Sequence, residues 1–324
     1  MNEEKLPHGT GLQELPIDTR DFSFEQTFGS VSLSELPKDD FFVSEPLEIK
    51  DQDVNYVSDF CAAYAASSVS EDQEGVELVP EYTFSKAKQI VAGDRKASSE
   101  DELIQTINEF GLNLRDICRA ACKFGFLERI YDPFHCNTAQ RPPRADLADW
   151  RRWPADLEML AFEHRKNSFF LVDGSYDFFD NIRATLWKNR PEQRSVIVGA
   201  RWRPSWSRTK GGVISSSVYD VKETGGGHAF KIFGQMNVEI EGKKEMCLVA
   251  QLSNGQKWGD KGIFYFTRDV VNREIAPFGA FTFKDLSKEK AQTLKDLGIS
   301  ANASIARKIL ALLWYLVKNL TKNQ

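Results

Sequence analysis

The chain has 324 residues, of which 41% are hydrophobic and 27% charged, and its formal net charge is −5. This composition is typical of a soluble globular protein with a sizeable core, and it excludes collagen-like, coiled-coil and disordered designs. The basic residues do not gather into one block, which argues against nucleic-acid binding through phosphates. The five cysteines are scattered without a CxxC pair, so neither a disulfide framework nor a structural zinc site is predicted. No apolar signal segment opens the sequence, and we expect a reducing, cytoplasmic location.

The first 36 residues are rich in Pro, Gly, Ser and acidic residues and show no sustained hydrophobic period. This pattern predicts that residues 1–36 form an extended arm lying across the surface of the domain. Further along, the alanine-rich run from Cys61 to Val69 favours a helix, and Asp59 is its expected cap. Cys61 therefore falls in the first turn, where the helix dipole lowers the pKa of a thiol.

Four further helices are predicted from hydrophobic periodicity and capping residues, at 98–110, 114–125, 156–166 and 176–189. The second of them carries Cys118 and Cys122 four positions apart. No histidine or acidic side chain lies at a matching spacing, so core packing is favoured over metal binding for this pair.

The character of the chain then changes to short β-branched and aromatic runs separated by Gly-rich or polar turns, which predicts an antiparallel sheet or barrel. A helical lobe at about 50–190 thus precedes a β lobe at about 191–285. The tail at 286–324 contains an apolar helical stripe over 302–320, flanked by Lys and Arg and too short to span a bilayer. Docking of this stripe on its own domain or on a protein partner is favoured, and a membrane-surface helix is the alternative.

Four blocks occur in a fixed order: IKDQ, CAAYA, GGGHAFKIFG and SNGQKWGDKGIFYF. Together they resemble the signature blocks of papain-like cysteine peptidases, over about residues 36–270. The resemblance implies an α+β fold over 37–285, with a helical left lobe, an antiparallel β-barrel-like right lobe and the active site between them. It implies hydrolysis of a polypeptide substrate without a cofactor. The missing disulfide pattern is similar to that of the branch found in bacteria and their viruses.

Carried over position by position, the resemblance implies that Cys61 is the nucleophile and His228 the general base and acid. It also implies that Gln52 donates to the oxyanion and that Asn254 orients the imidazole. Three further residues are expected to bind substrate: Trp258, Gly227 and Gly111.

The sequence also departs from the family pattern. Eight residues separate Gln52 from Cys61 where the family usually has five, so this loop must bulge if Gln52 is to reach the oxyanion. Ser58 stands where the family usually has a half-cystine. An ungapped count puts Leu252 in the place of the orienting asparagine, but leucine forms no side-chain hydrogen bond, so Asn254 is favoured.

Two other functions remain open at this point. One is a catalytically inactive papain-like protein that binds partners, indicated by the altered approach to Cys61. The other is a different Cys-His amide hydrolase, such as an amidase acting on cell-wall peptides or a transglutaminase-like enzyme. Those classes lack a glutamine ahead of the cysteine, so the role of Gln52 distinguishes them.

Overall fold

A computed structural model describes residues 11–14, 18, 21–46, 48–174, 177–218 and 226–284. The described residues up to 283 form one compact unit. The apolar stripe expected over 302–320 lies outside the described residues. Within the described ranges, no helix has both the length and the apolar character needed to cross a bilayer.

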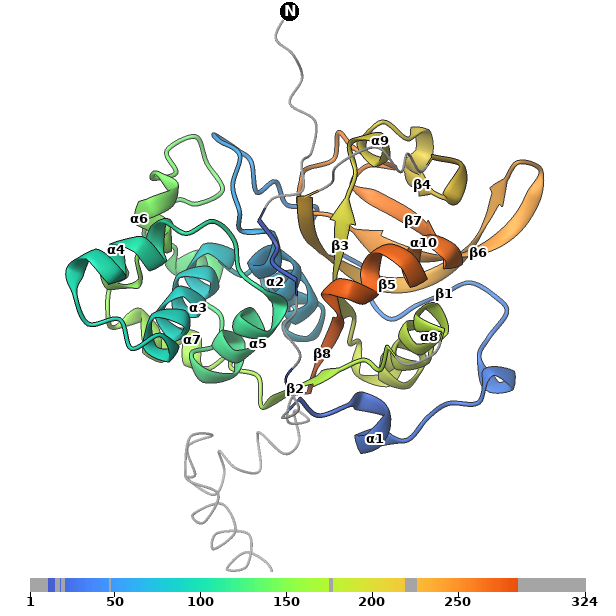
Figure 1. The fold of residues 1–324 in the computed structure, drawn as a ribbon, viewed down its shortest axis with the longest axis horizontal. Coiled ribbons are helices and arrows are strands. Elements are labelled where there is room, and N and C mark those ends of the chain that lie inside the picture. Colours follow the sequence, from blue (N-terminus) through green and yellow to red (C-terminus); the bar gives the residue numbers. More distant parts are fainter. Residues whose placement is uncertain are drawn as a thin grey trace, which may run out of the picture. The chain divides into compact units, whose positions relative to one another are not determined.

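The described residues form ten α-helices and eight strands (Figure 1). The helices are α1 (Phe24–Phe28), α2 (Cys61–Glu74), α3 (Pro80–Asp94), α4 (Glu100–Asn108), α5 (Leu114–Lys123), α6 (Arg144–Ala148), α7 (Leu157–Phe162), α8 (Phe178–Asn189), α9 (Pro204–Ser207) and α10 (Arg268–Val270). The strands are β1 (Phe41–Phe42), β2 (Ser168–Leu171), β3 (Val196–Trp202), β4 (Val213–Ile214), β5 (Gly226–Ile240), β6 (Lys243–Gln251), β7 (Ile263–Thr267) and β8 (Ala280–Lys284).

The five helices expected from the sequence are present as α2, α4, α5, α7 and α8, and local signals set their ends. Ser99 and Glu102 form a capping box at the start of α4. Helix α2 ends at Gly75, which adopts the left-handed conformation that glycine accepts without strain. Helix α3, which begins with Pro80, was not among the elements expected from the sequence.

The strands form one sheet in the order β2-β8-β3-β5-β6-β7-β4, and β1 pairs with β5 outside this path. Neighbours are mainly antiparallel, but β4 and β7 run parallel. The α+β class is confirmed. The barrel-like lobe takes the form of an open sheet, because β2 and β4 at the two ends of the order are not neighbours.

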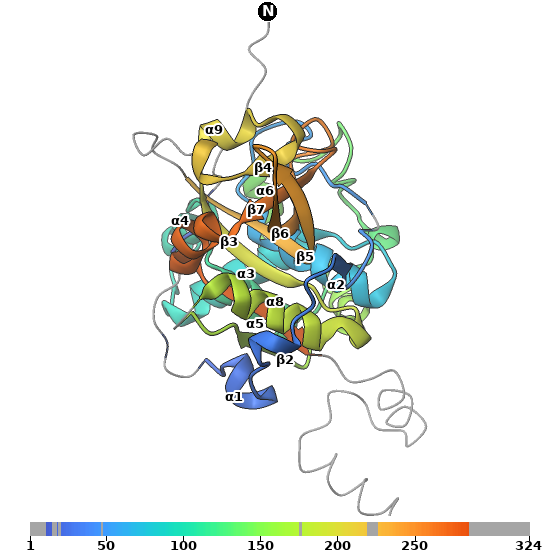
Figure 2. The ribbon, with the colours of Figure 1, turned by 90° about the vertical axis from the view of Figure 1, so that its right-hand side faces the viewer.

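Two hydrophobic clusters fill the unit, one among the helices around α2 and one between the sheet and α8. Helices α3 to α7 gather on one side and the sheet on the other, with α2 between them (Figure 1). In Figure 2 α8 lies below β3, on the face of the sheet opposite α2. Helix α2 packs on β5, and a buried ion pair of 2.8 Å between Asp72 and Lys231 joins the two elements.

Candidate active site

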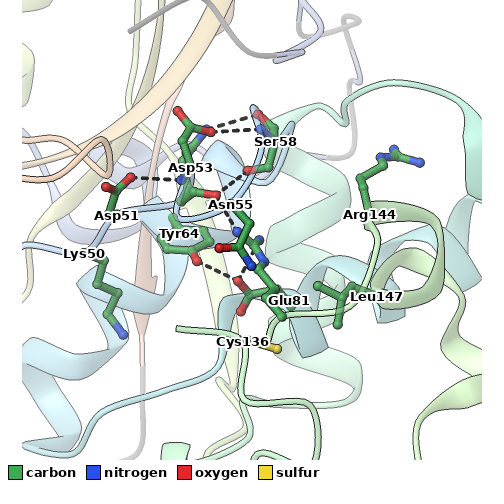
Figure 3. A network of polar contacts seen from close by, with 12 residues as sticks. Lys50, Asp51, Asp53, Asn55, Ser58, Tyr64, Glu81, Cys136, Arg144 and Leu147 are labelled. Atoms are coloured by element: carbon green, nitrogen blue, oxygen red, sulfur yellow. Dashed lines mark hydrogen bonds and ion pairs between the residues drawn. The ribbon is translucent and has the colours of Figure 1, made fainter. Parts of the chain in front are cut away.

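The loop between Gln52 and Cys61 folds back on itself and leaves Gln52 beside the start of α2. The side-chain nitrogen of Gln52 donates to the carbonyl oxygen of Ser58 at 3.2 Å, and the Ser58 hydroxyl donates to the Gln52 carbonyl at 2.9 Å. The Ser58 N–H donates to Asp53 at 2.8 Å and closes the loop, as Figure 3 shows. The extra loop residues therefore bulge outward, and the buried Gln52 side chain bonds to Ser58, three residues before the cysteine.

Ser253 sets the orientation of the Gln52 amide. The Gln52 N–H donates to the Ser253 carbonyl at 2.7 Å, and the Ser253 hydroxyl donates to Gln52 Oε1 at 2.7 Å. Because Oε1 accepts this bond, the side-chain NH₂ group lies on the opposite side of the amide, toward Ser58 and the start of α2. Ser253 was not predicted from the sequence, although it lies next to Asn254 in the SNG stretch.

A buried ion pair supports the backbone of Gln52 from behind. Arg141 donates to the Gln52 carbonyl at 2.5 Å and to Glu81 at 2.9 Å, and neither side chain of the pair is exposed. The Tyr64 hydroxyl, on α2, donates to the same Glu81 oxygen at 2.6 Å (Figure 3). Burial, together with Glu81, raises the pKa of Tyr64 well above its usual value. These residues were also missed, because Arg141 lies in an irregular segment without a motif.

His228 opens the buried part of β5, where it pairs with Ala200 of β3. Its ring packs edge-on against Trp202, with ring centroids 5.5 Å apart. Burial lowers the pKa of His228 to about 4, and the Asn254 side chain opposes this shift because its amide favours the protonated ring. Asn254 also donates to Asp53 at 3.1 Å. Of the two candidates for the orienting position, the structure thus places Asn254 beside the imidazole.

Leu252, the ungapped alternative, lies in the hydrophobic cluster of the sheet. Trp258, expected at the substrate site, is half-buried and packs against the same cluster.

Cys61 is the first residue of α2 and is fully buried. It belongs to the same hydrophobic cluster as Ala229, the residue after His228. The expectation that Asp59 caps this helix is wrong, since no side chain caps it. The Asp59 carboxylate instead accepts the Gly111 N–H at 2.6 Å and pairs with Arg144 at 2.5 Å, which hold it away from the helix end.

The arm passes between Gly111 and Gly227, the two glycines expected to line the site. The Leu12 N–H donates to the Gly227 carbonyl at 3.1 Å, and the Gln13 N–H donates to the Leu112 carbonyl at 3.1 Å. A Cβ on Gly227 would lie 2.0 Å from the Leu12 carbonyl oxygen, so this close approach requires glycine. Leu12 itself is 6% exposed and shares the hydrophobic cluster that contains Cys61.

Among the described residues, no group of three or more His, Cys, Asp or Glu side chains is arranged to hold a metal ion. Cys118 lies in the hydrophobic cluster around α2, in line with the core packing expected for it.

No family model matches the sequence, and no curated protein resembles it at the level of sequence. Solved structures are similar in fold. Xylellain, a cysteine protease from Xylella fastidiosa, has a TM-score of 0.65 at 16% identity, over 89% of this chain and 100% of that one. Procathepsin B S9 from Trypanosoma congolense has a TM-score of 0.55 at 17% identity, over 86% and 87% of the two chains. Digestive procathepsin L 3 of the Tenebrio molitor larval midgut has a TM-score of 0.52 at 11% identity, over 79% and 73%. The fold of this chain is that of papain-like cysteine proteases.

Proposed function

We propose that this chain is a cysteine peptidase that hydrolyses peptide bonds through Cys61 and His228. One observation carries the proposal. A single loop of the sheet lobe supplies Ser253, which orients Gln52, and Asn254, which faces the His228 ring. Residues far apart in the sequence thus meet near the start of α2, and this supports the Cys61–His228 pair that we propose for acyl transfer.

In the proposed reaction, His228 takes the thiol proton of Cys61, and the sulfur attacks the scissile carbonyl carbon. The Gln52 amide and the Cys61 backbone N–H donate to the resulting oxyanion. His228 then protonates the leaving amine, and a thioester remains on Cys61. Water, deprotonated by His228, attacks the thioester and releases the carboxylic acid and the thiol.

The arm affects the pKa of His228 in this site. In the structure His228 is buried and its pKa is about 4, so the ring is neutral at pH 7 and can act as a base. When a solvated substrate replaces the arm, we expect the pKa to move back toward its ordinary value of about 6.5.

The domain limits expected from the sequence are part of the proposal: an arm at 1–36, a peptidase domain at 37–285 and a tail at 286–324. We propose that the tail docks on the chain's own domain or on a protein partner, with a membrane surface as the alternative. All five cysteines are thiols in the structure. This supports the reducing, cytoplasmic location that we propose.

The test measures alkylation of each cysteine by iodoacetamide at neutral pH, in the full chain and in the Leu12→Asp variant, with the modified residue identified by mass spectrometry. Burial raises the pKa of Cys118, and it raises that of Cys247 to about 12, so both serve as slow internal references. We expect Cys61 in the variant to react at least about tenfold faster than either, and His228→Gln to abolish the difference. Equal rates at all three thiols would contradict a peptidase and favour an inactive binding protein.

A matched assay follows turnover of a quenched fluorescent peptide library. Cys61→Ser is expected to abolish turnover, and Gln52→Ala to lower it by about 10²- to 10³-fold. Turnover that is lost with Cys61→Ser but unaffected by Gln52→Ala would favour another Cys-His hydrolase.

A further inference from the structure

A buried charge cluster joins the start of α2 to the segment 107–112. Asp59, two residues before Cys61, has no exposed side-chain surface. Its carboxylate accepts the Gly111 N–H at 2.6 Å and two N–H groups of Arg144, at 2.8 Å and 2.5 Å. Both carboxylate oxygens are therefore used, and the bonds to Arg144 are charge-assisted and bidentate.

Arg144 also holds the carbonyl groups of this segment. One guanidinium nitrogen donates to the Ile107 carbonyl, and another donates to the Glu109 carbonyl at 2.7 Å. In Figure 3 the Arg144 side chain points away from Glu81 and Cys136, so its cluster is separate from the ion pair behind Gln52.

Lys88 of α3 adds a second cation to the same segment. Its ammonium group donates to the Glu109 carbonyl at 2.6 Å and to the Gly111 carbonyl at 3.1 Å. Two cations and one carboxylate thus bind backbone groups of Ile107, in the last turn of α4, and of Glu109 and Gly111, in the irregular stretch that follows the helix. Without these bonds the irregular stretch would be free to move.

The segment held in this way presents its backbone to an extended peptide. Leu12 forms a parallel bridge with Leu112, and the Gln13 N–H donates to the Leu112 carbonyl at 3.1 Å. A Cβ on Gly111 would lie 1.4 Å from the Gly11 carbonyl oxygen, so the arm lies directly on this backbone. The chain's own arm therefore shows that the Gly111–Leu112 edge binds a main chain.

We propose that Arg144 and Asp59 are positioning residues that fix the Gly111–Leu112 edge relative to Cys61 and thereby hold an extended peptide beside the nucleophile. This role deepens the proposed peptidase function and rests on it where the peptide is a substrate.

The test compares Arg144→Lys, Asp59→Asn/Arg144→Met and the control Arg151→Lys in the full chain. Removing both charges together avoids leaving one buried charge unpaired, so the double variant is expected to fold. Arg151 pairs with Glu100 and Asp149 on the surface, away from the segment.

The first measurement is amide hydrogen exchange by mass spectrometry. In the double variant we expect exchange to rise by about 10- to 100-fold in 107–112 and in the arm at 11–14, with α8 unchanged. Arg144→Lys, which keeps the charge but loses the bidentate geometry, should give an intermediate rise, and Arg151→Lys should give none. Unchanged exchange in the arm would overturn the proposal, and so would a uniform rise that includes α8.

The second measurement is kinetic. To remove competition from the arm, the double substitution is made in the Leu12→Asp background. We expect KM for the quenched peptides to rise about tenfold relative to Leu12→Asp alone, while kcat changes less than about threefold, because the edge binds peptide without touching the reacting atoms. A fall in kcat at constant KM would overturn the positioning role. If Leu12→Asp, with its arm released, shows no turnover at all, the peptidase proposal fails, but exchange in the arm of the full chain still decides whether the pair positions a peptide.

Discussion

The backbone N–H of Leu12 donates a 3.1 Å hydrogen bond to the carbonyl oxygen of Gly227, the residue immediately before His228. The same arm residue forms a bridge with Leu112 on the helical side. The arm thus occupies the position between the two lobes that we assign to substrate, and its release must precede turnover.

Leu12→Ala is therefore expected to raise peptidase activity. The Leu12 side chain is buried, and losing this burial weakens the docking of the arm by about 2 kcal/mol, which corresponds to about 30-fold in the open population. Initial rates on quenched peptides measure the effect. Glu14→Gln is the matched control, because the Glu14–Arg201 ion pair is largely exposed and contributes little. Faster exchange of the arm in Leu12→Ala without higher activity would show that the arm does not block substrate.

Arg141→Met is expected to destabilise the fold by about 3 to 5 kcal/mol, because it leaves the buried Glu81 carboxylate without its cation. Replacing both residues, in Arg141→Met/Glu81→Gln, should recover most of this loss. Urea unfolding followed by circular dichroism gives the free energies. A double variant no more stable than Arg141→Met alone would contradict the assignment of the cost to an unpaired charge.

Ser253→Ala is expected to lower kcat by about 10-fold, because the Gln52 amide loses the bond that sets its orientation. The decisive comparison is with Gln52→Ala, which removes the oxyanion donor itself. If Ser253 acts through Gln52, then Gln52→Ala/Ser253→Ala should be no slower than Gln52→Ala alone. Multiplicative losses in the double variant would assign Ser253 an independent role.

The pH dependence of stability should contain a contribution from His228. Its folded pKa of about 4 lies below the ordinary value of 6.5, so the folded chain binds fewer protons than the unfolded chain between these two values. The contribution is therefore fully present above pH 6.5 and is lost as the pH falls toward 4, by about 3 kcal/mol. The glutamine in His228→Gln does not titrate. The difference in free energy of unfolding between the unsubstituted chain and this variant should therefore narrow or reverse as the pH falls.

Urea titrations at pH 7 and pH 4.5 measure this gap. His164 titrates in the opposite sense, because its contacts with Glu74 and Glu128 raise its pKa. His164 is present in both chains, so its contribution cancels in the difference between their free energies of unfolding. Parallel pH profiles for the two chains would show that His228 is not buried in its neutral form.

The sequence predicts the parts of this fold that local patterns specify. Alanine spacing places a helix at Cys61, and β-branched or aromatic runs place strands β3 to β7, including the one that carries His228. Strands β1, β2 and β8 lie outside those runs. Helix α3 was missed because Pro80 and the mixed residues after it give no clear amphipathic period. The sequence left an open sheet and a barrel as alternatives, since sheet closure depends on the pairing of distant strands.

Within the site, block order pointed to Gln52 and Asn254, and the structure places them at adjoining positions. The expected cap at Asp59 was wrong because Arg144, distant in the sequence, binds its carboxylate more favourably than the helix end does. Ser253 and Arg141 act through contacts between remote segments, and no local spacing reveals such contacts.

Gln52 belongs to the helical side of the unit and Ser253 to the sheet side, and each bonds the other through both main chain and side chain. A refolding intermediate with one hydrophobic cluster formed and the other unformed would have a glutamine amide of random orientation. The return of the peptidase activity that we propose would then lag behind the return of helical circular dichroism. The delay between the two signals would give the time that the helical and sheet sides take to associate. Recovery of turnover would therefore measure a late step of folding.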